Sequence, residues 1–346
     1  MERQRTEYLF DDQLMIITKT PFRISFFGGG TDYPAWFREY GGSVLATTIN
    51  KYCYITCRYL PPFFEHKHRI VYSAIENVRE ISEIKHPSVR AVLDYMLVQD
   101  GLEIHHDGDL PARSGLGSSS SFTVGLVHAL SALGGKYASK ESLAKSAIDI
   151  EQNIIRENVG SQDQVSAAFG GFNRIEFHQD DTFEVSPVVL PMHRHSELQD
   201  HLMLFFTGFT RIASEVAKAK IENLKNRVTE LQYMRQMVNE ALAILGNPDD
   251  PIEKFGRLLA ESWKYKRGLS DRVSTPEIDD LFETACRAGA IGGKLLGAGG
   301  GGFILLFVRP ELQARVKASL GTLVHVPFRF ESSGTRVVLY QPNGLG

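Results

Sequence analysis

A glycine-serine segment constrains this chain more than any other part of its sequence. It reads Asp109-Leu-Pro-Ala-Arg-Ser-Gly-Leu-Gly-Ser-Ser-Ser-Ser-Phe122 and lies between a strand-like stretch, 102–106, and a stripe of apolar residues at helical spacing. Gly115 and Gly117 have no Cβ, so the backbone can turn there and approach a ligand closely. The serines that follow open the helix, where free N–H groups and the helix dipole favour an anion. The segment therefore predicts a phosphate-binding turn.

Other interpretations of the glycines explain the sequence less well. A plain glycine turn with a serine N-cap needs one serine, and four follow here. A Walker loop needs Gly-Lys followed by Ser or Thr, whereas the Gly-Lys pairs at 135–136 and 293–294 precede Tyr and Leu. The glycines of 297–302 fit a dinucleotide fingerprint in spacing, but they lead into a strand instead of a helix. Phosphate binding at the glycine-serine segment remains the favoured interpretation.

The composition indicates a large globular protein. The chain has 346 residues, 43% of them hydrophobic, and a formal net charge of -3, without the basic excess of a nucleic-acid binder. No signal-peptide core stands at the N-terminus, and no apolar run approaches the roughly 20 residues that span a bilayer. The three cysteines form no close metal-ligand pairs, which fits a reducing cytoplasm.

The pattern along the chain predicts an α+β protein, because strand clusters and helices occur without regular alternation. Strands are expected at 15–20, 23–27, 44–60, 102–106, 172–177, 201–207 and 303–308, and helices at 88–99, 122–133, 140–158, 213–245 and 278–288. We expect an N-terminal extension over residues 1–14, a first domain over residues 15–195 and a second domain over residues 196–346.

Three separated motifs occur in a fixed order. They are Pro21-Phe-Arg-Ile-Ser-Phe-Phe-Gly-Gly-Gly-Thr-Asp-Tyr33, the glycine-serine segment, and Lys294-Leu-Leu-Gly-Ala-Gly-Gly-Gly-Gly-Phe303. This ordered trio resembles the GHMP kinase superfamily over nearly the whole chain, from about residue 15 to about residue 326. The resemblance implies an N-terminal domain like ribosomal protein S5 domain 2, a ferredoxin-like C-terminal domain and an active site in the cleft between them.

The resemblance also implies catalytic roles. The segment Gly160-Ser-Gln-Asp-Gln164 looks like the galactokinase Gly-x-x-Asp-Gln motif, which makes Asp163 the base that accepts the proton of the acceptor hydroxyl. Arg23 would steady Asp163 and offset the charge that develops during transfer. ATP would lie with its phosphates on the glycine-serine segment. The expected ATP-binding residues are Pro111, Arg113, Ser114, Gly115, Leu116, Gly117, Ser118, Ser119 and Ser120.

A metal site follows from the same resemblance. Glu151 stands where the family keeps a metal-binding glutamate, and with Ser119 or its neighbour Ser118 it would hold Mg²⁺ against the phosphates. Plainer interpretations exist for single residues: Glu151 as an exposed helix carboxylate, or Asp163 as an N-cap. The joint occurrence of the motifs favours the functional interpretation.

The N-terminal motif argues against galactose, because Gly29 and Gly30 replace the glutamate and histidine of galactokinases. It resembles instead the D-glycero-α-D-manno-heptose 7-phosphate kinases, which phosphorylate the anomeric (C1) hydroxyl to give the 1,7-bisphosphate for GDP-heptose and bacterial surface polysaccharides such as capsule. A phosphorylated acceptor needs cationic partners. The expected acceptor-binding residues are Gly29, Gly30, Thr31, Asp32, Gly299, Gly300, Arg211, Lys266 and Arg267, with Lys294 as a further cation.

Two alternatives stay open. One is an anomeric kinase for an unphosphorylated sugar such as fucose, and the other is a galactokinase-like ligand sensor without turnover. The joint retention of Asp163, Arg23 and Glu151 favours an enzyme. We expect a cytoplasmic protein that uses ATP and Mg²⁺ and acts on a small-molecule sugar phosphate, with no nucleic-acid or membrane partner. A homodimer is left open.

Overall fold

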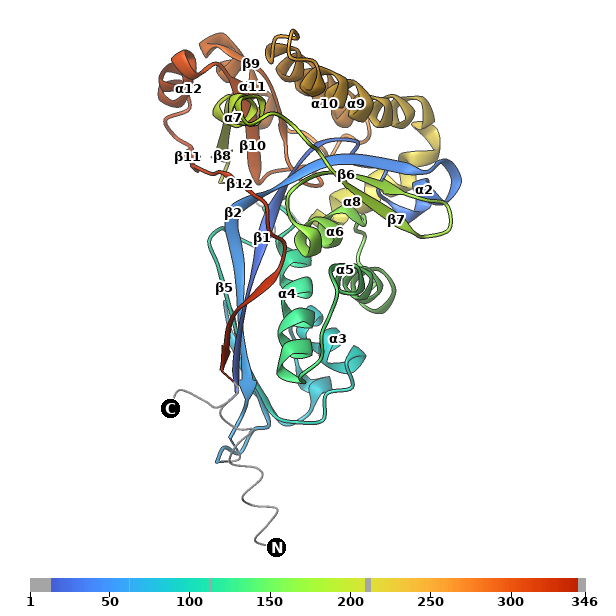
Figure 1. Ribbon diagram of the computed structural model, residues 1–346, viewed down its shortest axis with the longest axis vertical. Helices are drawn as coiled ribbons and strands as arrows, with labels where there is room; N and C mark the ends of the chain where they lie inside the picture. Colours follow the sequence, from blue (N-terminus) through green and yellow to red (C-terminus); the bar gives the residue numbers. More distant parts are fainter. Residues whose placement is uncertain (1–13, 62, 113, 209–212, 342–346) are drawn as a thin grey trace, which may run out of the picture.

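The computed structural model describes residues 14–61, 63–112, 114–208 and 213–341. Two sheets lie at the centre of two packed halves (Figure 1). The predicted α+β class is confirmed by this mixture of helices and largely antiparallel strands. Residues 1–13 of the expected N-terminal extension, together with Arg113 and Arg211, lie outside the described residues.

The first half contains most of the long strands. Its elements are β1 (Met15–Phe27), α2 (Pro34–Tyr40), β2 (Gly42–Tyr59), β3 (His68–Val71), β4 (Ile75–Val78), η1 (Ile81–Glu83), α3 (Pro87–Tyr95), β5 (Leu102–Gly108), α4 (Ser118–Leu133), α5 (Lys140–Asp149), η2 (Ile150–Ile154), α6 (Gln162–Phe169), β6 (Phe172–Phe177) and β7 (Phe183–Pro187).

The second half is richer in helices. Its elements are α7 (Met192–Asp200), β8 (Leu202–Phe206), α8 (Ala213–Asn223), η3 (Leu224–Asn226), α9 (Val228–Gly246), α10 (Glu253–Arg267), α11 (Pro276–Ala288), β9 (Ala290–Leu295), β10 (Phe303–Val308), η4 (Pro310–Leu312), α12 (Gln313–Ser319), β11 (Val324–His325), β12 (Phe330–Glu331) and β13 (Arg336–Gln341).

The first sheet has the order β13-β1-β2-β5-β3-β4, with β6 and β12 also paired to β2. Helices α4, α5 and α6 lie on one side of it (Figure 1). Residues 15–19 of β1 alternate between half-buried and buried, whereas residues 20–27 are buried without alternation. This change follows because residues 20–27 are covered on both faces of the sheet, and strands covered in this way have no polar face.

The second sheet has the order β11-β8-β10-β9 and is antiparallel. After β11 the chain returns to the first sheet, where β12 pairs with β2 and β13 pairs with β1. The division into residues 15–195 and 196–346 stays a prediction, and the last two strands contribute to the sheet of the first half. Within the described ranges, no helix combines the length and apolar character that crossing a membrane requires.

The predicted helix over residues 140–158 is interrupted in the structure. The α-helix ends at Asp149, and a π-helical turn follows over Ile150–Ile154, with the N–H of Ile155 donating to the carbonyl of Ile150. π-turns often occur at functional sites. This turn carries Glu151, whose side chain is drawn inward to α4. Residues 157–160 then leave the helix and reach the cavity described below.

Aromatic rings join the two halves. Phe255 of α10 lies against Phe26 and Phe27 at the end of β1, with ring centroids 5.4 and 5.1 Å apart in edge-to-face geometry. All three side chains are fully buried. Such pairs add to the stabilisation that burial provides. The ring of Phe255 therefore fixes α10 against the strand that leads into the N-terminal glycine motif.

We predict that Phe255→Ala lowers the free energy of unfolding by about 3–5 kcal/mol, because it leaves a cavity between the halves. Denaturant titration followed by tryptophan fluorescence measures this change. The control is Phe63→Ala, the same substitution at a ring that is 86% exposed, which should change stability little. Equal effects of the two substitutions would contradict the role of Phe255 in joining the halves.

Candidate active site

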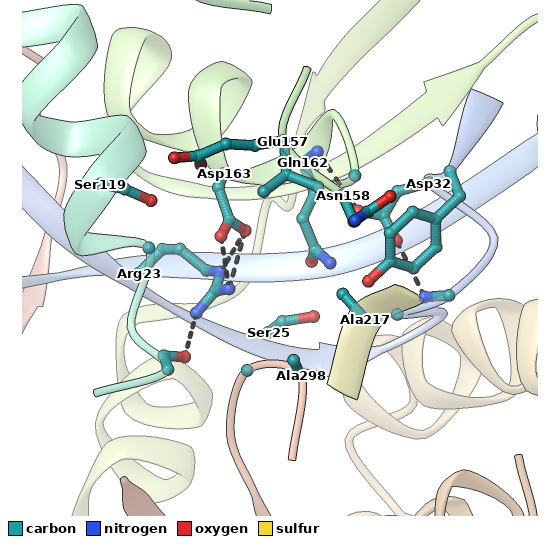
Figure 2. A pocket seen from close by; sticks show the side chains of 18 of the residues that line it. Arg23, Ser25, Asp32, Ser119, Glu157, Asn158, Gln162, Asp163, Ala217 and Ala298 are labelled. Atoms are coloured by element: carbon teal, nitrogen blue, oxygen red, sulfur yellow. Dashed lines mark hydrogen bonds and ion pairs between the residues drawn. The ribbon is translucent and has the colours of Figure 1, made fainter. Parts of the chain in front are cut away.

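A cavity lies where the two halves meet, and four segments of the chain form most of its wall (Figure 2). The first half contributes residues from 23–33, from the glycine-serine segment at 115–119, and from 157–163. The second half contributes Ala217, Lys266, Lys294, Gly297 and Ala298. Three of the sequence motifs, far apart in the chain, therefore line one cavity.

An ion pair between Arg23 and Asp163 lies at the centre of this wall (Figure 2). The Nε of Arg23 donates to Oδ1 of Asp163 at 2.7 Å, and Nη2 donates to Oδ2 at 2.8 Å. Two-pronged contacts of this kind are stronger and more directional than a single hydrogen bond. The third nitrogen, Nη1, donates to the carbonyl of Gly115 at 2.7 Å. Arg23 is 4% exposed, so one buried guanidinium holds both the carboxylate and the loop.

The glycine-serine segment has the backbone that its sequence predicts. Gly115 and Gly117 have φ angles of 88° and 76°, in the left-handed region that favours glycine. A Cβ on Gly117 would lie 3.4 Å from Cγ of Asp163, so the turn passes directly over the carboxylate. Helix α4 then begins at Ser118 without a side-chain cap among the described residues. Its first two residues, Ser118 and Ser119, line the cavity, and the free N–H groups of a helix start suit an anion.

The expected ATP-binding residues divide between the cavity wall and the layer behind it. Gly115, Gly117, Ser118 and Ser119 line the cavity. Ser114, Leu116 and Ser120 are buried. The carbonyl of Leu116 accepts from the backbone N–H of Arg23 at 3.0 Å and anchors the loop to β1. Pro111 is exposed and is not part of the cavity wall.

Glu151 lies behind the loop. Its Oε2 accepts from the hydroxyl of Ser120 at 2.8 Å and from the amide of Gln164. Its Oε1 is buried and has no hydrogen-bond partner among the described residues. Burial raises the pKa of this carboxyl to about 7. The cavity wall itself carries a different carboxylate, Glu157, which follows the π-turn and which the sequence did not indicate.

The N-terminal glycine motif forms another part of the wall. Gly29, Gly30 and Asp32 line the cavity, whereas Thr31 is buried and its Oγ1 contacts backbone carbonyls. Asp32 Oδ1 accepts from the N–H of Gly30 at 2.8 Å. A Cβ on Gly160 would lie 1.9 Å from Asp32 Oδ2, so the chain before α6 packs directly on this carboxylate.

Tyr33, which the sequence analysis did not single out, also lines the cavity and is buried. Burial raises the pKa of its phenol well above the usual value, and the charges of Asp32 and Asp163 raise it further. The phenol therefore keeps its proton and can donate a hydrogen bond.

The cationic residues expected to bind the phosphate of the acceptor do not all lie on the cavity wall. Lys266 lines the cavity, and its Nζ donates to the carbonyls of Leu295 and Gly297 at 2.7 and 2.6 Å. Lys294 also lines it and reaches from β9 to the carbonyl of Phe26 at 2.7 Å. Arg267 does not line the cavity. It is paired with Asp279 at 3.1 Å instead.

The C-terminal glycine-rich turn contributes residues two positions earlier than expected. Gly299 and Gly300 are not part of the cavity wall: a Cβ on Gly299 would lie 2.7 Å from Cα of Val273, and the N–H of Gly300 donates to the carbonyl of Val273. Gly297 and Ala298 line the cavity in their place. The sequence gives the glycine-rich turn but not which of its residues face inward.

Comparisons with known proteins show the family of the chain. The sequence model of the GHMP kinases N terminal domain matches residues 69–171, and that of the GHMP kinases C terminal domain matches residues 250–324. The chain is 31% identical over 307 residues to the D-glycero-alpha-D-manno-heptose 7-phosphate kinase of Campylobacter jejuni, covering 85% of this chain and 90% of that protein. The chain therefore belongs to the GHMP kinase family, which confirms the resemblance and the two-domain kinase fold.

Two further relatives are sugar kinases by their names. The crystal structure of a D-glycero-D-manno-heptose 1-phosphate kinase from Bacteroides thetaiotaomicron superposes with a TM-score of 0.75 at 26% identity, covering 93% of this chain and 98% of that one. The bifunctional fucokinase/GDP-fucose pyrophosphorylase of Arabidopsis thaliana is 25% identical over 85% of this chain and 30% of that protein.

The raised pKa of Glu151 gives a prediction for stability against pH. An acid whose pKa is higher in the folded than in the unfolded state stabilises the fold below its unfolded pKa and loses this contribution as pH rises through the folded pKa. We predict that in the metal-free protein the contribution of Glu151 to stability is lost from about pH 4.5 to about pH 7, and that Glu151→Gln changes the dependence of stability on pH by removing this loss. Unfolding free energies in a chelating buffer across that range measure it.

The control for this prediction is Glu141→Gln, the same chemical change at an exposed carboxylate on α5. It should leave the slope as in the unchanged protein. A slope that Glu151→Gln does not alter would contradict the assignment of a raised pKa to this buried carboxyl.

Proposed function

We propose that this GHMP family kinase transfers the γ-phosphate of ATP to the anomeric hydroxyl of D-glycero-α-D-manno-heptose 7-phosphate and forms the 1,7-bisphosphate. The observation that carries this proposal is the Arg23–Asp163 pair directly beneath the turn at Gly117. A carboxylate at the start of an anion-binding helix is where a base meets the oxygen that attacks a bound phosphate. The similarity to the heptose 7-phosphate kinase supports the choice of acceptor.

The residues of the chain divide the chemistry between them. The loop from Gly115 to Ser119 would hold the donor phosphates with its backbone N–H groups and hydroxyls. Asp163 would receive the proton of the acceptor hydroxyl as its oxygen approaches the γ-phosphate. Arg23 would hold Asp163 in place and offset the negative charge that develops nearby. Closely placed reactants account for much of the acceleration in phosphoryl transfer.

A magnesium ion on the donor side of the cavity is part of this proposal. The hydroxyl of Ser119 lines the wall, and Glu151, which lies behind the loop and not on the wall, has a buried Oε1 without a protein partner in the described chain. Hydroxyl and carboxylate oxygens, completed by phosphates and water, are ligands that Mg²⁺ accepts. We propose that Ser119 and Glu151 hold it, and when bound it would neutralise charge on the phosphates.

The acceptor would lie against the N-terminal glycine motif, with Asp32 on one side. The lysines of the second half, Lys266 and Lys294, are the cations that this wall offers to the phosphate that the sugar already carries. The structure gives Arg267 less support in this role, because it is paired with Asp279 outside the wall. A cytoplasmic site of action in GDP-heptose synthesis for surface polysaccharides follows from this acceptor, and a homodimer remains a hypothesis.

An anomeric kinase for free fucose is the second candidate, favoured by the similarity to the bifunctional fucokinase. A ligand sensor without turnover is less well supported, because the ion pair and the loop are both intact. Coupled ADP release, measured with heptose 7-phosphate, fucose, galactose and mannose as acceptors, distinguishes the candidates. Phosphorus NMR of the product locates the new phosphate. Phosphate on any position other than the anomeric carbon would refute the proposed reaction.

We predict that Asp163→Asn lowers kcat by about 10²- to 10⁴-fold, the range for loss of a general base, while ATP binding stays intact. Steady-state kinetics and calorimetric ATP titration measure the two effects. Asp181→Asn is a matched control, because Asp181 also pairs with an arginine, Arg38, but at the surface. Unchanged ADP formation in the Asp163 variant would refute its role as the base.

A further inference from the structure

Two buried polar groups on the cavity wall have no hydrogen-bond partner in the described part of the chain. They are the hydroxyl of Ser25 and Oε1 of Gln162. The two residues are only 7% and 9% exposed. Buried polar atoms are nearly always paired, and leaving one unpaired costs stability. Both residues line the cavity, although these two atoms have almost no exposed surface of their own, so the simplest missing partner is a ligand that enters the cavity and contacts them.

The positions of Ser25 and Gln162 in the chain place both groups beside the Arg23–Asp163 ion pair (Figure 2). Ser25 follows Arg23 by two positions on β1, so both side chains project from the same face of the strand. Gln162 is the first residue of α6 and directly precedes Asp163. A ligand hydroxyl bound to Ser25 and Gln162 would therefore lie close to the carboxylate that receives the proton.

Gly29 leaves space beside the hydroxyl of Ser25 and the amide nitrogen of Gln162. A Cβ on Gly29 would lie 3.6 Å from Oγ of Ser25 and 3.7 Å from Nε2 of Gln162. Its neighbours Gly28 and Gly30 have φ angles of 79° and 112°, so their backbone requires glycine. Gly29 has no such positive φ. The backbone conformation does not require glycine at position 29. Because the residue there is glycine, no side chain fills the space over the Ser25 hydroxyl and the Gln162 amide.

We propose that Ser25 and Gln162 form a specificity subsite that binds a hydroxyl of the acceptor other than the one that is phosphorylated. The serine hydroxyl donates and accepts, and the glutamine amide does both through its two ends, which is the pairing that an alcohol group needs. The proposal rests on the proposed function in one respect, that the ligand is a polyhydroxylated sugar. A site built to pair a hydroxyl discriminates strongly against analogues without it.

The test is calorimetric titration of heptose 7-phosphate into the full-length protein and into Ser25→Ala and Gln162→Met. Loss of one neutral hydrogen bond corresponds to a rise in Kd of about 3- to 10-fold. We expect this rise for the sugar phosphate in each variant, with the Kd for ATP and the melting temperature unchanged. Ser43→Ala is the matched control, since Ser43 is also buried with an unpaired hydroxyl but does not line the cavity.

The outcomes separate this inference from the proposed function. An unchanged sugar Kd in both variants, or a rise as large in Ser43→Ala, would overturn the subsite. If the unchanged protein binds heptose 7-phosphate without turnover, the proposed reaction fails. The ratio of the Kd of each variant to that of the unchanged protein still decides whether Ser25 and Gln162 bind the sugar. If it binds no sugar phosphate and no free sugar, both proposals are refuted.

Discussion

The ion pair between Arg23 and Asp163 is the interaction on which the site depends. It joins the middle of β1 to the first turn of α6. The third guanidinium nitrogen of Arg23 donates to the loop before α4. Three elements from separate parts of the chain are thus fixed by one buried guanidinium. Arginine suits this position because its planar fork matches the carboxylate and keeps a donor for the loop, which lysine cannot do. Removal of the Asp163 carboxylate would leave the charge of the buried Arg23 without this partner.

The second half of the protein supports this arrangement from behind. The turn after β9 packs backbone to backbone on the loop, since a Cβ on Gly297 would lie 2.4 Å from Cα of Gly115. Lys266 holds the same turn through its carbonyl contacts, and Lys294 ties β9 to the end of β1. These lysines therefore have structural contacts besides their place on the cavity wall. Such close approach of two backbone segments is possible only where both segments carry glycine.

The sequence predicted those parts of the site that short local patterns encode. The loop, its helix and the paired Arg23 and Asp163 lie in compact motifs, and the structure brings them together. Which side chains point into the cavity was harder to predict, because their orientation depends on contacts between distant segments. Lys266 and Arg267 are neighbours on α10, but successive helical residues point about 100° apart, and only Lys266 faces the cavity. Ser25 and Glu157 had no distinguishing pattern in the sequence, and neither did the π-turn that carries the buried Glu151.

In the proposed reaction, one cavity holds both the donor phosphates and the anomeric hydroxyl, with Asp163 between them. A crystal structure with a non-hydrolysable ATP analogue and heptose 7-phosphate tests it most directly. The account predicts that the γ-phosphate lies on the turn at Gly115 to Ser119, and that an oxygen of Asp163 lies within hydrogen-bond distance of the anomeric oxygen. A sugar bound elsewhere, or one whose anomeric carbon points away from Asp163, would contradict the account.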